Sequence, residues 1–184
     1  MSAIDFILIR HGRQSAGFHV DPDPGLDETG EAQARAMAER LTPDEARNLV
    51  TSPLRRARAT AAAVEVRHGV IARVEPRIAE VPTAGLTLEQ RGAWLPGFLH
   101  GAWSDQPDHL IAWRRSIGDF FAGIETPGVF VTHFVVVNAL IGLATGDDRV
   151  SPSLPDHCSI NRFRLEAGRV RLIETGAQRE TMVG

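Results

Sequence analysis

The chain of 184 residues contains a single cysteine, Cys158, so an intramolecular disulfide cannot form. A scaffold held together by disulfides is therefore excluded, and this scarcity is typical of proteins from a reducing compartment. The flanking residues Asp156-His157-Cys158-Ser159 supply no partner thiol. We expect Cys158 to be structural or incidental rather than catalytic.

The sequence also lacks a long apolar run. Its most apolar segment, Val129–Ala144, is interrupted by His133 and Asn138 and is too short to span a membrane. Near the start, Asp5 and Arg10 enclose only four apolar residues, which does not fit a secretory signal. We therefore expect a cytoplasmic protein that has no membrane partner.

Neither sign of charge is in large excess, since the formal net charge is -3. The basic run Arg55-Arg56-Ala57-Arg58 is short and isolated, so no general attraction to nucleic acid is expected. Hydrophobic residues make up 43% of the chain and charged residues 23%, as in ordinary globular proteins. Without repeats or linkers, residues 1–184 are expected to form one domain.

Short β-branched runs alternate with Ala-rich helical segments, which predicts a mainly parallel α/β sheet in a three-layer α/β/α sandwich. The predicted strands are Ile4–Ile9, Asn48–Thr51, Val70–Val74, Val129–Thr132, Ile160–Glu166 and Val170–Glu174, the last two forming a hairpin. The predicted helices are Glu31–Leu41, Pro53–His68, Asp108–Ile124 and Phe134–Ala144. Residues 80–106 are expected to form a small, irregular cap over the sheet edge.

Two of these helices have recognisable start signals. Thr29 is a plausible cap for the helix Glu31–Leu41. Ser52 is the expected N-cap of the helix Pro53–His68, with proline at the first helical position.

Polar residues follow three of the predicted strands. Arg10-His11-Gly12 follows the first strand, Ser52-Pro53-Leu54-Arg55-Arg56 follows the second, and His133 follows Val131-Thr132. If these strands are parallel neighbours, two histidines and at least two arginines converge at one edge of the sheet. Arginine binds phosphate oxygens in a bidentate manner, and a neutral histidine can attack phosphorus. The set therefore favours phosphoryl chemistry.

In their order and spacing, these residues resemble the histidine phosphatase superfamily, the phosphoglycerate mutase-like proteins. The resemblance rests on Arg10-His11-Gly12, on Ser52-Pro53-Leu54-Arg55-Arg56-Ala57 and on a late strand that ends in His133. The segments Gly25–Ala34 and Cys158-Ser159-Ile160 are similar to lesser patterns of that family. The likeness spans most of the chain.

The resemblance implies a role for each site residue. His11 would be the phosphorylated nucleophile, and Arg10, Arg56 and His133 would bind the phosphate. Glu80 would be the proton donor, which then activates water. As a further hypothesis, Asn138 contacts the substrate. No metal or other cofactor is expected, since Asp156-His157 has no accompanying cluster with ligand spacing.

Each of these residues also has a structural interpretation. His11 and His133 could be packed core histidines, and Arg55 could take the inner position in place of Arg56. Glu75 and Glu89 compete with Glu80, and Asn138 could serve in helix packing. The sequence departs from the family at Gly17, where many members have asparagine, and at Phe134-Val135, where a glycine-rich pair is common.

The function predicted first is a metal-independent phosphomonoesterase that acts on a small phosphorylated substrate through a phosphohistidine at His11. Trp94, Phe98 and Trp103 in the cap would set selectivity, although Trp94 and Trp103 could equally be packing residues. The alternatives are a mutase-like phosphotransferase and a non-catalytic module that binds a phosphate ligand. The sequence leaves the substrate and the oligomeric state open, and it does not exclude a phosphoprotein substrate.

Overall fold

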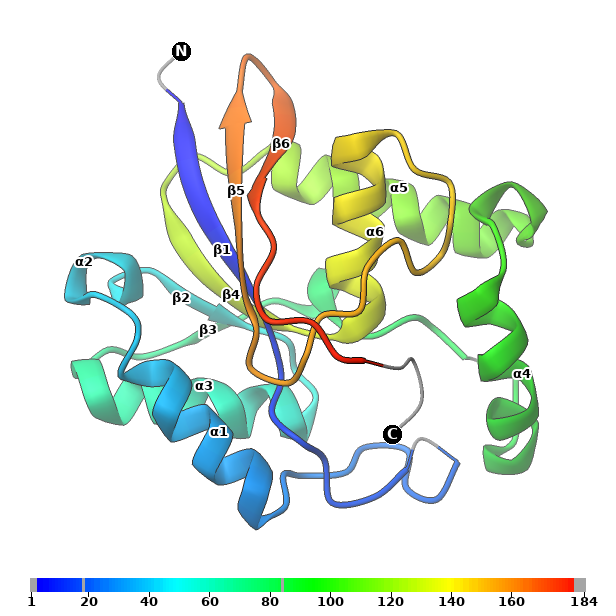
Figure 1. Ribbon diagram of the computed structural model, residues 1–184, viewed down its shortest axis with the longest axis horizontal. Coiled ribbons are helices and arrows are strands. Elements are labelled where there is room, and N and C mark those ends of the chain that lie inside the picture. The colour runs from blue at the N-terminus through cyan, green and yellow to red at the C-terminus, as the bar shows by residue number, and fades with distance from the viewer. Residues whose placement is uncertain (1–2, 18, 84, 181–184) are drawn as a thin grey trace.

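The computed structural model describes residues 3–17, 19–83 and 85–180, which fold around a six-stranded sheet (Figure 1). The strands are β1 Ile4–Arg10, β2 Leu49–Thr51, β3 Arg73–Val74, β4 Gly128–Thr132, β5 Ile160–Glu166 and β6 Arg169–Glu174. Their order is β3-β2-β4-β1-β5-β6, in which β3, β2, β4 and β1 pair as parallel neighbours, β5 pairs antiparallel with β1, and β6 pairs antiparallel with β5. The predicted mainly parallel sheet is confirmed.

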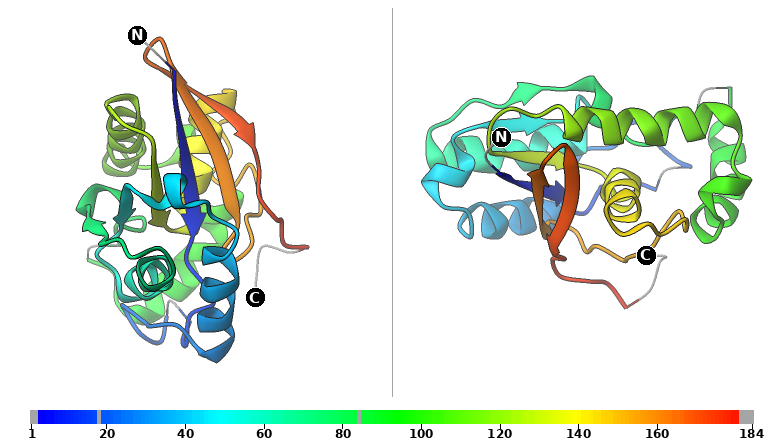
Figure 2. Two further views of the ribbon diagram at one scale, coloured as in Figure 1. Left: turned by 90° about the vertical axis from the view of Figure 1, so that its left-hand side faces the viewer. Right: turned by 90° about the horizontal axis from the view of Figure 1, so that it is seen from above.

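Helices cover both faces of this sheet. They are α1 Glu28–Ala38, α2 Pro43–Ala46, α3 Arg55–His68, α4 Leu88–His100, α5 Asp108–Ala122 and α6 Phe134–Thr145. Short 3-10 turns, η1 and η2, span Pro76–Ile78 and Trp103–Asp105. α1 and α3 pack on one face and α5 and α6 on the other, which confirms the three-layer sandwich (Figure 2). In the part of the chain described, no helix has the length and apolarity needed to cross a bilayer.

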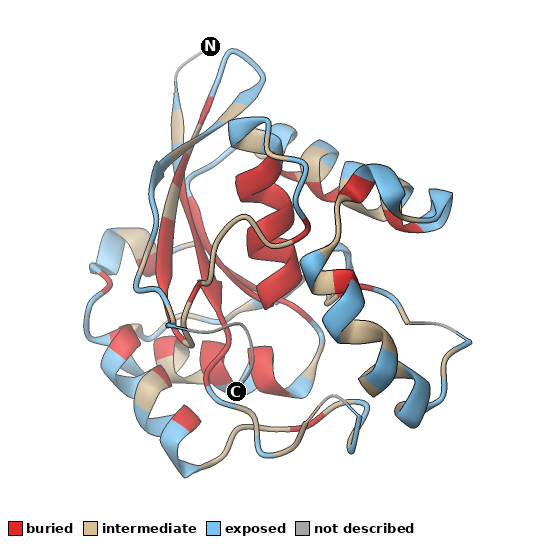
Figure 3. Cartoon of the chain, turned by 45° about the vertical axis from the view of Figure 1, so that its right-hand side comes forward, coloured by how far each residue is buried: buried red, intermediate tan, exposed pale blue. Residues whose placement is uncertain are grey.

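The central strands are buried on both faces because their side chains alternate. In β1, Ile7 and Ile9 join the core under α1 and α3, whereas Phe6 and Leu8 join the core under α5 and α6. A third apolar cluster joins α4 and η2 to the start of α6, which is buried along most of its length (Figure 3). The buried sheet and α6 hold the loops at the strand ends in place.

The loop after β1 meets the start of α1 at two glycines. A Cβ atom on Gly12 would lie 2.6 Å from the carbonyl oxygen of Gly30, and one on Gly30 would collide with the Arg13 carbonyl. Both positions therefore require a residue without a side chain. This contact joins two of the motifs singled out in the sequence.

The predicted starts of two helices are wrong. α1 begins at Glu28 rather than Glu31, because the Asp27 side chain caps it by accepting a hydrogen bond from the Gly30 amide. Thr29, the predicted cap, instead accepts a hydrogen bond from the Arg13 guanidinium.

α3 begins at Arg55 rather than at Pro53, and Ser52 is not its N-cap. The Ser52 hydroxyl accepts a hydrogen bond from the Leu54 amide in a turn before the helix, and Leu54 itself stands at the N-cap position.

Two further predictions need correction. The strand Val70–Val74 is reduced to Arg73–Val74, an exposed edge strand that pairs with β2. The cap region is not irregular throughout, since it contains α4. A capping box between Thr87 and Gln90 starts this helix, whereas Pro96 in its interior masks the helical pattern.

Candidate active site

Three parallel strands end at the same edge of the sheet. Arg10 at the end of β1 is opposite Thr132 at the end of β4, and β2 lies against the other side of β4. The residues that follow the three strands are His11, Ser52 and His133, so they meet at this edge. The predicted convergence is therefore present in the fold.

The His11 ring is held in one orientation by hydrogen bonds at both nitrogens. His11 is 2% exposed, its Nδ1 lies 2.7 Å from the Gly12 carbonyl oxygen, and its Nε2 lies 3.2 Å from Arg56 Nε. Since Arg56 can only donate, Nε2 accepts and Nδ1 carries the proton. Burial, followed by the positive charge of Arg56, lowers the pKa of His11 well below 6.5, so the ring is neutral at neutral pH.

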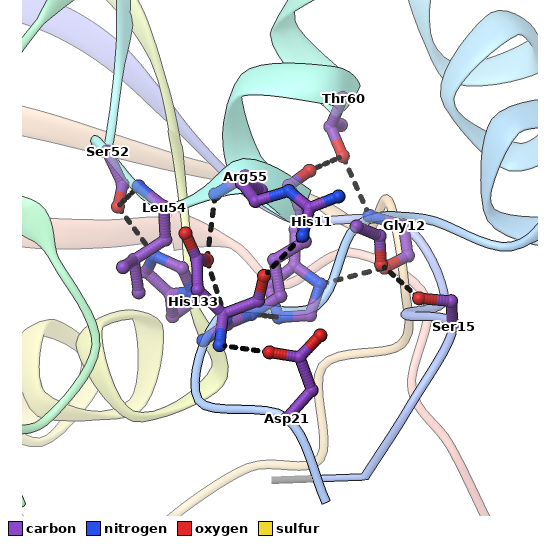
Figure 4. Close-up of polar contacts among 12 residues, drawn as sticks. His11, Gly12, Ser15, Asp21, Ser52, Leu54, Arg55, Thr60 and His133 are labelled. Carbon is purple, nitrogen blue, oxygen red and sulfur yellow. Dashed lines mark hydrogen bonds and ion pairs between the residues drawn. The ribbon is translucent and has the colours of Figure 1, made fainter.

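Arg56, and not Arg55, takes the inner position. It lies in the first turn of α3 and is 3% exposed, while Arg55 is exposed to solvent. The next turn supports this arrangement, because Thr60 Oγ1 donates to the Arg56 carbonyl and accepts from the Gly12 amide (Figure 4). The start of α3 is thus tied to the loop that contains His11.

Arg10 is buried beside His157. Its guanidinium donates to the Pro155 carbonyl oxygen at 2.9 Å and to His157 Nε2 at 3.1 Å. Burial lowers the pKa of Arg10 to about 10, which leaves it charged at neutral pH. Burial, followed by the Arg10 charge, lowers the pKa of His157 to about 3, so this ring is neutral and adds no positive charge.

His133 directly follows β4, at the N-cap position of α6, and its ring centroid lies 5.2 Å from that of His11. Its Nε2 is 2.7 Å from the Ser52 hydroxyl, whereas its Nδ1 is buried and has no hydrogen-bond partner among the described residues (Figure 4). Burial lowers its pKa well below 6.5. A neutral histidine with one free nitrogen therefore stands beside His11.

Glu80 is the predicted acid that reaches this site. It follows η1, is half-buried and lines a pocket together with Arg10, His11 and Arg56. Burial raises the pKa of its carboxyl group, and Arg56 and Arg10 oppose that shift only in part.

The two competing carboxylates are placed elsewhere. Glu75 is clamped by Arg77, at 2.7 Å and 2.8 Å, and by Arg73, and these hydrogen bonds lower its pKa to about 2. Glu89 lies exposed in the first turn of α4. Neither belongs to the described lining of the pocket.

The pocket, counted with its open mouth and the solvent space there, has a volume of about 660 Å³. Its described lining combines a polar set with an apolar wall. The polar residues are Arg10, His11, Gln14, Arg56, Glu80 and Arg179, and the apolar ones are Val81, Leu95, Leu99, Phe134 and Val135. Gln14 and Arg179 were missed by sequence reasoning, because no local motif marks them.

Several residues expected at the site have structural contacts instead. Asn138 is fully buried, donates to the Phe134 carbonyl and accepts from the amide and hydroxyl of Ser153, so it joins α6 to a loop. This placement does not support the substrate contact predicted for Asn138. Trp94 stacks on Phe98, and Trp103 is 1% exposed; none of the three lines the pocket, so they are packing residues.

Cys158 is buried, and burial raises the pKa of its thiol to about 12, as suits a structural cysteine. In the described ranges there is no group of three or more His, Cys, Asp or Glu side chains placed to hold a metal ion.

Comparison with known proteins agrees with this fold. The family model of the histidine phosphatase superfamily (branch 1) matches residues 6–178. The fold is similar to "Mycobacterial hydrolase 1", with TM-score 0.71 and 24% identity over 97% of this chain and 100% of that one. A search of the curated proteins found no match.

Two further structures are named as phosphatases. A mycobacterial glucosyl-3-phosphoglycerate phosphatase in complex with VO3 is similar at TM-score 0.68 and 26% identity, over 95% of this chain and 100% of that one. A structure named as a candidate alpha-ribazole-5'-P phosphatase from Escherichia coli is similar at TM-score 0.73 and 17% identity, over 96% and 97% of the two chains.

Proposed function

The chain belongs to the histidine phosphatase superfamily, and from this membership we propose that it hydrolyses a small phosphate monoester through a phosphohistidine at His11. His11 Nε2 attacks phosphorus while the bond to the leaving oxygen breaks, and Glu80 gives that oxygen its proton. Water then attacks the phosphohistidine and gives a proton back to Glu80. Phosphate leaves, and both His11 and Glu80 return to their starting forms.

The observation that carries this proposal is the tautomer of His11. Because Nδ1 donates to the Gly12 carbonyl, the lone pair of the neutral ring is at Nε2, on the side of Arg56. A buried ring that stays unprotonated at neutral pH is suited to nucleophilic attack. The Arg56 contact also places a fixed positive charge next to the atom at which phosphate would be bound.

Positive charge at the pocket supports the choice of phosphate as the group that reacts. Arg10 and Arg56 are buried guanidinium groups close to His11, and His133 has a nitrogen that lacks a partner among the described residues. We infer that these three side chains bind the phosphate oxygens and stabilise the charge that spreads over them in the transition state.

The lining of the pocket and the names of similar structures favour a small organic phosphate. The apolar wall formed by Val81, Leu95, Leu99 and Phe134 offers contact to the carbon body of such a molecule. Similar structures are named as phosphatases of a glucosyl phosphoglycerate and of a ribazole phosphate, both small molecules. These names support the choice of a small phosphate monoester as the substrate class, and they do not identify the substrate.

The proposal is tested by phosphate release from 4-nitrophenyl phosphate in the presence of a chelator. We expect turnover in the unchanged protein, loss of turnover in His11→Ala, and little change in the matched control His109→Ala, whose side chain is exposed on α5. Rapid quenching followed by mass spectrometry should locate the phosphate on the peptide that contains His11.

Three results would count against this mechanism. Turnover that persists in His11→Ala would exclude His11 as the nucleophile. Transfer of the phosphate to an added alcohol or second substrate, in place of water, would identify a mutase-like phosphotransferase. Phosphate binding without turnover of a panel of phosphorylated metabolites would identify a binding module.

A further inference from the structure

Arg179 is brought to the pocket by the segment that follows β6. Its amide donates to the Leu154 carbonyl at 2.7 Å, and the Asp156 amide donates to the Ala177 carbonyl at 2.8 Å. The side chain of Gln178 accepts from the Leu154 amide, also at 2.8 Å. These bonds pair residues 177–179 with the loop 154–156, so Arg179 is held at a fixed place beside the pocket.

The side chain of Arg179 differs from the other two arginines of the pocket in having no partner among the described residues. Arg10 donates to Pro155 and His157, and Arg56 donates to His11. Within residues 3–17, 19–83 and 85–180, the Arg179 guanidinium forms no hydrogen bond or ion pair, although it is half-buried. Its charge nevertheless acts on its neighbours, since it adds to the effect of burial in lowering the pKa of Arg10, and to the effects of burial and Arg10 in lowering that of His157.

Among the described residues, no carboxylate close to Arg179 forms an ion pair with it. It also lines an adjoining cleft, in which Asp27 is paired with Arg13 at 2.6 Å and Asp156 accepts from the His157 amide. Among the described residues of the pocket itself, Glu80 is the acidic one, and its charge interacts with Arg56 and Arg10. The pocket therefore contains one more positive charge than a single phosphate would engage through Arg10 and Arg56.

We propose that Arg179 forms a second anion-binding site in this pocket and selects phosphate monoesters that carry another negatively charged group, such as a carboxylate. The proposal rests on the phosphomonoesterase function above. The phosphate is bound at the His11 end, the carbon body lies along the apolar wall, and the second anion accepts hydrogen bonds from the Arg179 fork. A guanidinium fork binds carboxylate in a bidentate manner, which favours this group over a neutral amide of the same shape.

Binding of non-hydrolysable ligands tests the second site without depending on turnover. The ligands are the 3- and 4-carboxybenzylphosphonates, each compared with its carboxamide by isothermal titration calorimetry. We expect at least one carboxylate to bind roughly 10- to 100-fold more tightly than its amide, as for a hydrogen-bonded charge. Arg179→Met should bring this ratio close to one by weakening the carboxylate alone, and Arg179→Lys should restore part of it. Arg169→Met, an exposed arginine of β6, is the matched control and should leave the ratio unchanged.

Several outcomes would overturn the proposal. They are a ratio near one in the unchanged protein, a preference that survives in Arg179→Met, equal weakening of carboxylate and amide by Arg179→Met, and no binding of either ligand. Failure of the proposed function gives a different result, namely 4-nitrophenyl phosphate turnover that is absent or that persists in His11→Ala, whatever the binding ratio.

Discussion

Replacing Glu80 by glutamine removes the proposed proton donor while keeping the shape of the side chain and its acceptor for the Val81 amide. For an alkyl phosphate, whose leaving oxygen needs a proton, kcat/KM should fall by roughly 10²- to 10⁴-fold, the usual contribution of general acid catalysis. This corresponds to about 2.7–5.4 kcal/mol of transition-state stabilisation. For 4-nitrophenyl phosphate the loss in kcat/KM should be much smaller, because nitrophenolate leaves without a proton.

The pH dependence adds a second test of the same residue. Burial raises the pKa of Glu80, so the carboxyl group keeps its proton above the ordinary value of 4.5 and loses it as the pH rises further. Burial lowers the pKa of His11, so the nucleophile stays neutral below 6.5. The wild-type kcat/KM for an alkyl phosphate should therefore be highest at acidic pH, and Glu80→Gln should lose the decline on the basic side.

Two carboxylates provide controls for this experiment. Glu89→Gln, at an exposed position, should leave both substrates unaffected. Glu75→Gln breaks the clamp with Arg73 and Arg77, so it should lower stability without changing the ratio between the two substrates. Equal losses for alkyl and nitrophenyl phosphates in Glu80→Gln, or no loss for either, would refute the assignment of Glu80 as the acid.

Three other changes test the framework around the site. Gly12→Ala places a methyl group against the Gly30 carbonyl and, like other overpacking substitutions, should lower the free energy of unfolding by about 1–3 kcal/mol. Urea unfolding measures this change, and an unchanged urea midpoint would contradict the close contact. Ser52→Ala leaves His133 Nε2 and the Leu54 amide without their partner and should cost about 1–3 kcal/mol, together with a lower kcat/KM; full activity would show that the hydroxyl does not position the ring. The pKa of His157 is about 3 in the fold and 6.5 when unfolded, so the unfolded chain binds more protons between these values and stability falls as pH drops below 6.5. In thermal unfolding, His157→Gln should reduce that fall by up to about 1.4 kcal/mol per pH unit, and an identical pH slope would mean that His157 is not buried in its neutral form.

The sequence was sufficient to predict most of the fold because the apolar runs and the turns are local signals. Ile4–Ile9 and Ile160–Glu166 read as strands from a few adjacent residues, and they are strands in the structure. The helix starts were less predictable. Thr29 and Ser52 are residue types that often cap helices, but in the fold Thr29 is hydrogen-bonded to Arg13 and Ser52 to His133. Helix α4 was not predicted, because Pro96 in its interior argues against a helix more strongly than the Thr87–Gln90 capping box argues for one.

The residues of the candidate site also divide into those that local signals place and those that depend on tertiary contacts. Arg10, His11 and His133 could be placed from the strand ends alone, because parallel strands finish at one edge of a sheet. Arg179 lies far from any motif in the sequence. It reaches the pocket because its segment pairs with the backbone of residues 154–156, and no local sequence pattern predicts this pairing. Asn138 shows the opposite error, in which a helical position one turn from His133 faces a supporting loop and not the pocket.

The pairing of β1 also has a consequence for how the protein is made. Arg10 pairs with Thr132, and the other edge of β1 pairs with residues 160–165. At synthesis rates of about 5–20 residues per second, the first strand waits roughly 6–24 s for β4 to be added. During that interval its apolar side chains have no native partner strand, so nascent chains that stop before residue 133 cannot assemble the pocket and expose a strand prone to wrong pairing. Ribosome-bound chains of increasing length should therefore acquire phosphate affinity abruptly rather than by degrees.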